Sequence, residues 1–171
     1  QVIPHFTYPR LRMANVTARD YVIDLGSGDG RTVIMAAQKF GATALGIEYN
    51  PDMVALSERA AAKEGVAGKV KFINGDIFQT DFSQATVLTL YLLPGMMERL
   101  RPKLLKELKP GTRIVSHDFD LGEWKPDRSV EVQTPEEYDI TGSWTSTVHL
   151  WTVPAAVEGA WLGSLAGGRG G

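Results

Sequence analysis

Short apolar runs alternate with longer amphipathic stretches through residues 20–121 of the 171-residue chain. The expected strands cover residues 21–25, 43–48, 69–74, 85–91 and 112–119. Residues 69–74 alternate like a strand, and residues 85–91 form a continuous apolar run typical of a strand buried on both faces. Helical spacing follows over 32–40, from Asn50 and Pro51 to about residue 64, and from Pro94, where Met97, Leu100, Leu104 and Leu108 form one stripe. Strands separated by helices of this length predict an α/β fold with a doubly wound, mainly parallel sheet of the Rossmann type.

The segments on either side of this core differ from it. Residues 1–19 contain Pro4 and Pro9 without clean periodicity, which predicts an irregular segment. Residues 130–132 and 144–153 alternate like an antiparallel hairpin across a turn at Thr134, and a further strand around 157–162 precedes a glycine-rich tail. We therefore expect a single domain over residues 1–171, with an N-terminal segment (1–19), a core (20–121) and a C-terminal hairpin and tail (122–171).

Composition narrows the possible functions. Eighteen Lys and Arg against twenty Asp and Glu give a net charge of −2, which argues against non-specific binding of long nucleic acids. The absence of cysteine excludes disulfides and any zinc or iron–sulfur site that needs cysteine. The uncharged run 82–97 is too short for a bilayer and contains Pro94 and Gly95. With no visible signal peptide, we expect a cytoplasmic location without stable membrane insertion.

The most informative segment is the loop Gly26-Ser27-Gly28-Asp29-Gly30, which follows the first strand and opens the first helix. Its spacing is G-x-G-x-G, so it differs from the dinucleotide fingerprint G-x-G-x-x-G, in which Arg31 would have to be a glycine. Asp24 and Asp29 would repel a pyrophosphate at close range. A plain strand–helix turn is the alternative, but the loop favours a ligand with a cationic or zwitterionic head.

Two acidic residues extend this site along the sheet. Glu48 ends the second strand twenty residues after Gly28, where an acidic side chain is placed to accept both hydroxyls of a ribose. Asp76 follows the third strand and can accept from an adenine amine, while Ile77 packs on the ring. These residues describe a nucleoside with an amino-acid head and no phosphate, and S-adenosylmethionine fits that description.

At this point the sequence resembles the class I S-adenosylmethionine-dependent methyltransferases. The segments VIDLGSGDG, GIEYN, NGDIF and TVLTLYLLP carry the resemblance and occur in the order of that family. The resemblance implies that the glycine loop and Asp24 hold the methionine part, Glu48 the ribose, and Asp76 with Ile77 the adenine. It adds Tyr49 and Asn50, which follow Glu48, to the candidate cofactor residues.

A narrower resemblance concerns the acceptor. The segments GSGDGR, DFSQATV and LPGMMERLRPKLLKELKPGTRIVSHDFDLGEWKPD resemble the protein-lysine methyltransferases that modify the ATP synthase c-subunit and the adenine nucleotide translocase, together with their bacterial relatives. This resemblance implies an enzyme that methylates a lysine side chain of a protein partner, not a nucleic acid. The alternatives are a small-molecule N- or O-methyltransferase and a non-catalytic protein that binds S-adenosylmethionine or a nucleoside.

Three residues at the carboxyl ends of strands are candidates for the chemistry. Tyr91 ends the fourth strand and could line a lysine channel, accept a hydrogen bond from an amine or cap the sheet edge. His117 is a natural proton acceptor near neutral pH, and the carboxylate of Asp118 could hold an ammonium group. Adjacent strand residues point to opposite faces, so both can face one pocket only across a bulge. Asp120 would add a third metal ligand, but no fourth is apparent and we expect no metal.

Two further clusters have open interpretations. The basic residues of the helix after Pro94 form either a solvated face or a docking surface for an acidic partner, and they are Arg99, Arg101, Lys103, Lys106, Lys109 and, after the turn, Arg113. Four tryptophans lie in the last third of the chain, where we expect them to pack the hairpin. Trp124 could instead form a wall of the acceptor site.

Overall fold

The computed structural model describes residues 7–133 and 145–155. The expected turn at Thr134, the expected strand around 157–162, Trp144 and Trp161 lie outside the described residues. None of the helices in the described part of the chain is long and apolar enough to cross a bilayer.

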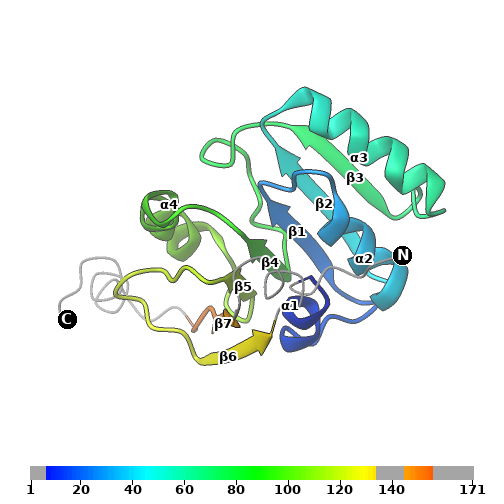
Figure 1. Cartoon of the computed structure of the whole chain (residues 1–171). Coiled ribbons are helices and arrows are strands. Elements are labelled where there is room, and N and C mark those ends of the chain that lie inside the picture. Colours follow the sequence, from blue (N-terminus) through cyan, green and yellow to red (C-terminus); the bar gives the residue numbers. More distant parts are fainter. Residues whose placement is uncertain (1–6, 134–144, 156–171) are drawn as a thin grey trace.

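The described residues form a seven-stranded sheet with four helices (Figure 1). The strands are β1 (Tyr21–Leu25), β2 (Thr43–Glu48), β3 (Val70–Asn74), β4 (Val87–Leu90), β5 (Arg113–His117), β6 (Arg128–Gln133) and β7 (Thr145–Thr152). The helices are α1 (Thr7–Met13), α2 (Arg31–Phe40), α3 (Pro51–Lys63) and α4 (Pro94–Glu107). The strand order is β3-β2-β1-β4-β5-β7-β6. Strands β1 to β5 are parallel and β7 and β6 are added antiparallel, which confirms the predicted fold class.

The sheet separates two apolar layers, because successive residues of each strand point to opposite faces. Ile23 and Leu88 point into the layer that contains α4 and Trp151. Val22 and Val87 point into the layer that contains α1, α2 and α3. This arrangement leaves the carboxyl ends of the parallel strands at one edge of the sheet, where the order reverses between β1 and β4.

The buried face of α4 consists of the apolar residues that the sequence pattern predicts. Met97, Leu100, Leu104 and Leu108 are all buried in the layer on this face of the sheet. The basic residues of α4 make contacts inside the chain: Arg99 lies over the ring of Phe78, Arg101 donates to the carbonyl of Leu121, and Lys103 pairs with Glu107. Arg99 and Arg101 therefore connect α4 to its surroundings, whereas the Lys103–Glu107 pair lies within the helix.

Two of the tryptophans pack in the core. Trp124 and Trp151 have ring centroids 6.4 Å apart, and the indole N–H of Trp151 donates to the backbone carbonyl of Trp124 at 2.7 Å. Both rings are buried beside α4. The packing interpretation therefore describes Trp124 better than a wall of the acceptor site.

The prediction of an irregular N-terminal segment is wrong for residues 7–13, which form α1. Sequence periodicity misses this helix because it is only seven residues long and depends on tertiary packing. Leu11 is fully buried, and the ring of Tyr8 packs on Phe40 of α2 with 5.5 Å between centroids. Pro9 is tolerated because it lies in the first turn, whose N–H groups have no partner within a helix.

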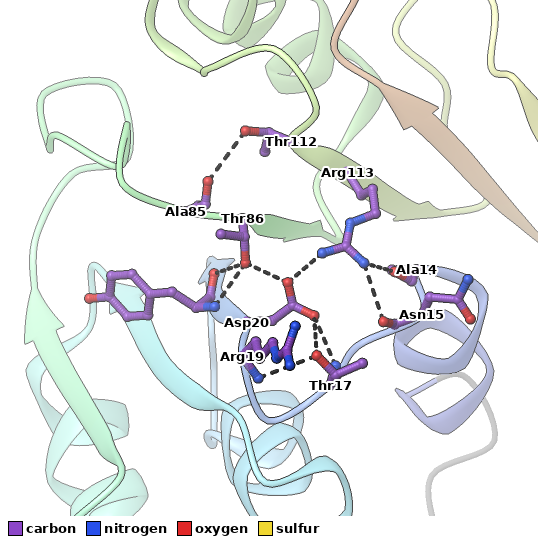
Figure 2. Close-up of polar contacts among 10 residues, drawn as sticks. Ala14, Asn15, Thr17, Arg19, Asp20, Ala85, Thr86, Thr112 and Arg113 are labelled. Atoms are coloured by element: carbon purple, nitrogen blue, oxygen red, sulfur yellow. Dashed lines mark hydrogen bonds and ion pairs between the residues drawn. The ribbon is translucent and has the colours of Figure 1, made fainter.

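Polar contacts fasten the end of α1 to the amino ends of three strands (Figure 2). Arg113 of β5 donates to the carbonyl of Ala14 at 2.5 Å and forms an ion pair with Asp20. Asp20 also accepts from the Thr17 N–H and the Thr86 hydroxyl, each at 2.8 Å. We call Asp20, Thr86 and Arg113 the amino-end clamp.

The carboxylate of Asp20 is held in its charged form. Partial burial opposes ionisation, but the hydrogen bonds from Thr17 and Thr86 and the charge of Arg113 outweigh it and lower the pKa of Asp20. Because the folded protein prefers the ionised form, the clamp contributes stability at neutral pH that is lost as the pH falls through this lowered pKa.

Candidate active site

The three glycines of the loop between β1 and α2 all have a backbone conformation that favours glycine, and they differ in the space around them. Gly26, Gly28 and Gly30 have φ angles of 73°, 56° and 84°, which favour glycine. A Cβ atom on Gly30 would lie 2.8 Å from the Ser57 hydroxyl and 2.9 Å from the Phe72 ring. A Cβ atom on Gly28 would meet nothing within 4 Å. Gly30 therefore allows α3 and β3 to approach the loop, whereas Gly28 lies beside open space.

Glu48 holds this loop directly. One oxygen of its carboxylate accepts from the Gly28 N–H at 2.8 Å, and the other accepts from the Asn50 N–H at 2.9 Å. Asn50 in turn caps α3 by accepting from the Asp52 N–H. A single carboxylate thus links the glycine loop to the end of β2.

A cavity of about 330 Å³ opens at the carboxyl edge of the sheet, next to the point where the strand order reverses. The glycine loop, α1, the start of α2 and the ends of β4 and β5 surround it. Its lining residues are Thr7, Arg10, Asp24, Gly26, Ser27, Gly28, Asp29, Arg31, Thr32, Tyr91 and His117. Seven of the residues that the sequence singles out as site candidates therefore line one cavity.

Asp24 is the buried carboxylate of this cavity. Its side chain accepts from the Thr89 hydroxyl of β4 at 2.6 Å. Burial raises the pKa of Asp24 to about 6; Arg10 and the Thr89 hydrogen bond act against this rise, and the charges of Glu48 and Asp29 add to it. The cavity therefore contains an acid that a positively charged ligand group would stabilise in its ionised form.

Arg10 of α1 lies in the same cavity, and sequence patterning contains no signal for it because its helix is not visible in the periodicity of residues 1–19. It is only 5% exposed, and its Nη2 donates to the Thr32 hydroxyl at 3.1 Å. Arg31, the other lining arginine, is bound through three hydrogen bonds to the Asp29 carboxylate and lies at the surface. The buried charges that face the cavity are thus Asp24 and Arg10.

Tyr91, His117 and Asp118 lie together, although only the first two line the cavity. The rings of Tyr91 and His117 are 4.5 Å apart between centroids. His117 is buried, and its Nε2 lies 3.4 Å from a carboxylate oxygen of Asp118. Asp118 has a φ of 65°, and its other oxygen accepts from the Thr147 N–H at 2.8 Å. The left-handed residue after β5 thus turns the Asp118 carboxylate back to the edge of the His117 ring.

The remaining candidates lie at the ends of β2 and β3, outside this cavity. Tyr49 is 80% exposed, and Asn50 caps α3. The Asp76 carboxylate accepts from the Phe78 N–H at 2.8 Å. Ile77 is buried in the layer that contains α4. These residues share the carboxyl edge with the cavity, because β2 pairs with β1 and β3 pairs with β2 in parallel register.

The described residues contain no group of three or more His, Cys, Asp or Glu side chains that could hold a metal ion. Asp120 instead accepts from the Gly122 N–H at 3.1 Å.

The cavity suits the amino-acid end of S-adenosylmethionine. Such a head carries one ammonium and one carboxylate, and the cavity presents one buried anion and one buried cation. The Ser27 hydroxyl is buried at the lining and has no hydrogen-bond partner among the described residues. A polar ligand group would satisfy it.

The sequence and the fold are similar to those of known methyltransferases. The ANTKMT methyltransferase domain matches residues 24–128. A protein-lysine N-methyltransferase of Saccharolobus islandicus (strain REY15A) is 40% identical over 144 residues, which cover 84% of this chain and 85% of that protein. The human lysine N-methyltransferase of the ATP synthase c-subunit is 42% identical over 109 residues, which cover 64% of this chain but 46% of that protein.

Among solved structures, an RNA methyltransferase from Salinibacter ruber in complex with S-adenosyl-L-homocysteine is 46% identical, with a TM-score of 0.79. The match covers 88% of this chain and 92% of that one.

Proposed function

This chain belongs to the ANTKMT methyltransferase family and is an S-adenosylmethionine-dependent methyltransferase, and from that premise we propose that its acceptor is a lysine side chain of a protein. The observation that carries the proposal is the aromatic pair Tyr91 and His117 at the rim of the cavity. The names of the Saccharolobus and human relatives support a lysine acceptor.

We further propose how the cofactor is held. The glycine loop Gly26–Gly30 approaches the methionine part, and Asp24 binds its ammonium group. The carboxylate of Glu48, while it organises the loop, accepts from the ribose hydroxyls. Asp76 and Ile77 bind the adenine at the end of β3, next to Tyr49 and Asn50. The bound cofactor supplies an electrophilic methyl group on a sulfonium, so the protein needs only to orient the acceptor and accept its proton.

The acceptor side is built by Tyr91, His117 and Asp118. Tyr91 lines the cavity and is 58% exposed, so an entering side chain meets an aromatic ring first. Such a ring suits the methylene chain of a lysine. Tyr91 orients the amine, His117 accepts the proton, and Asp118 stabilises the imidazolium that results.

An RNA acceptor is the second candidate, because the Salinibacter protein is described as an RNA methyltransferase. Three features of this chain count against it. The net charge is −2, and the segment at Tyr91-Leu92-Leu93-Pro94 lacks the polar residue that leads the Asn/Asp-Pro-Pro-Tyr segment of amino-methylating nucleic-acid enzymes. Much of the basic cluster on α4 is engaged inside the chain.

The test is transfer of tritiated methyl groups from S-adenosylmethionine into a heat-inactivated cell lysate. Label that protease removes, and that appears as methyl-lysine after acid hydrolysis, supports the proposal. Label that ribonuclease removes, or label in the small-molecule fraction, overturns it in favour of the other acceptors. Binding of S-adenosylhomocysteine without any transfer would indicate a non-catalytic binder.

Two variants separate the acceptor side from the cofactor side. We expect His117→Gln to slow transfer by about 10²- to 10⁴-fold, the range typical of a general base, while the affinity for S-adenosylhomocysteine changes little. The control is Lys39→Gln, at an exposed position near the end of α2 that does not line the cavity, and it should leave transfer unchanged.

A further inference from the structure

We propose that Arg10 of α1 binds the carboxylate of the cofactor's amino-acid head, opposite the ammonium-binding Asp24. The proposal adds a binding residue from outside the methyltransferase core and makes α1 part of the cofactor site. The proposal depends on the binding of S-adenosylmethionine and not on the identity of the methyl acceptor. It can therefore be tested independently of the proposed lysine substrate.

The burial of Arg10 is the first argument. A guanidinium that is 5% exposed loses most of its hydration, and burial lowers its pKa while the charge of Asp24 opposes this effect. Its Nη2 donates to Thr32, which is itself buried at the cavity wall. An arginine that served only to fill this space would be costly, because leucine or methionine would fill it without the desolvation of a charge. The burial of Arg10 therefore points to a binding role.

The distribution of charge in the cavity is the second argument. The lining carries two anions, Asp24 and Asp29, and two cations, Arg10 and Arg31. Asp29 and Arg31 bind each other at the surface, with a shortest contact of 2.7 Å. The other two charges, Asp24 and Arg10, are buried and attract each other, and they match the ammonium and the carboxylate of an amino acid.

The planar guanidinium suits the task, because it offers parallel N–H donors to the two oxygens of a carboxylate. The geometry of α1 supports this placement. Leu11 and the Tyr8–Phe40 contact hold the helix against α2, and the amino-end clamp fixes its carboxyl end. Arg10 therefore extends into the cavity from a helix that is held at both ends.

The test measures affinity by calorimetry for two ligands that differ only in the carboxylate: S-adenosylhomocysteine and its decarboxylated analogue, 5′-(3-aminopropylthio)-5′-deoxyadenosine. The wild-type protein should bind S-adenosylhomocysteine about 10- to 100-fold more tightly, as expected for a charge-assisted pair. In Arg10→Met this preference should shrink to about 3-fold or less, because only affinity for the carboxylate-bearing ligand depends on Arg10. Equal wild-type affinities for the two ligands would overturn the proposal.

A purely structural role gives a different result: Arg10→Met would then weaken both ligands equally and keep their ratio, which also overturns the proposal. The matched control is Arg12→Met, two residues along the same helix, which lies outside this cavity and should change neither affinity. If Arg10→Met does not fold, Arg10→Lys is measured in its place. Lysine keeps the charge but not the paired donors, so an intermediate ratio supports the proposal and an unchanged ratio refutes it.

Discussion

Replacing Asp24 with asparagine should make the ligand-free protein more stable and the cofactor complex weaker. In the folded protein, burial raises the pKa of Asp24 from its ordinary value of 3.8 to about 6. Each pH unit of difference corresponds to about 1.4 kcal/mol, so ionised Asp24 costs the folded state about 3 kcal/mol at neutral pH and above. This cost already includes the attraction of Arg10. Asparagine keeps the acceptor for the Thr89 hydroxyl without the charge.

The measurement is urea denaturation of Asp24→Asn and wild type without ligand. At about pH 8 the variant should have a free energy of unfolding higher by up to about 3 kcal/mol. Because the folded pKa is raised, the wild type regains this stability as the pH falls through about 6, and the two proteins converge near 3.8. Saturating S-adenosylhomocysteine should reverse the order, since the ammonium of the ligand pairs with the carboxylate.

The matched control is Asp29→Asn in the same loop. The hydrogen bonds from Arg31 lower the pKa of Asp29 despite its partial burial, so this variant should lose stability. A ligand-free Asp24→Asn protein that is equal to or less stable than wild type at about pH 8 would refute the argument from burial.

The remaining predictions follow from the same geometry. Gly30→Ala should lower the free energy of unfolding by about 2 kcal/mol or more in thermal unfolding, because its Cβ would lie 2.8 Å from the Ser57 hydroxyl. In Gly28→Ala the new Cβ meets no atom within 4 Å, so the loss of stability should come from the positive φ alone, about 1–2 kcal/mol. Glu48→Ala should weaken S-adenosylhomocysteine binding by about 1–3 kcal/mol in calorimetry, and unchanged affinity would remove its role. Asp20→Asn should lower stability at neutral pH but less at acid pH, and equal losses at both would contradict the lowered pKa.

The sheet can be predicted from sequence because its signals are local and repeated. Glycine and proline mark the turns, and the apolar runs of β1 and β4 are continuous, so the fold class follows from the alternation of strands and helices. The glycine loop and Glu48 are visible for the same reason, since they lie at fixed distances from a strand end.

Other parts of the site depend on tertiary contacts that leave no periodic signal. Helix α1 is too short to be read from spacing, and its stability comes from Leu11 and the amino-end clamp. Arg10 is missed for this reason. The contact between His117 and Asp118 is hidden because a regular strand would separate their side chains; it arises from the positive φ at Asp118.

The antiparallel pairing of β7 with β5 has a consequence for the integrity of the enzyme. It converts β5 from an edge strand into an interior one, and edge strands expose backbone groups that recruit other chains. Strand β7 also provides the Thr147 N–H, which donates to the Asp118 carboxylate and holds it beside His117. Substitutions that disrupt the pairing of β7 with β5 should therefore cause both aggregation and loss of methyl transfer. Substitutions in β3, which lies at the opposite edge of the sheet, should reduce the affinity for the cofactor first.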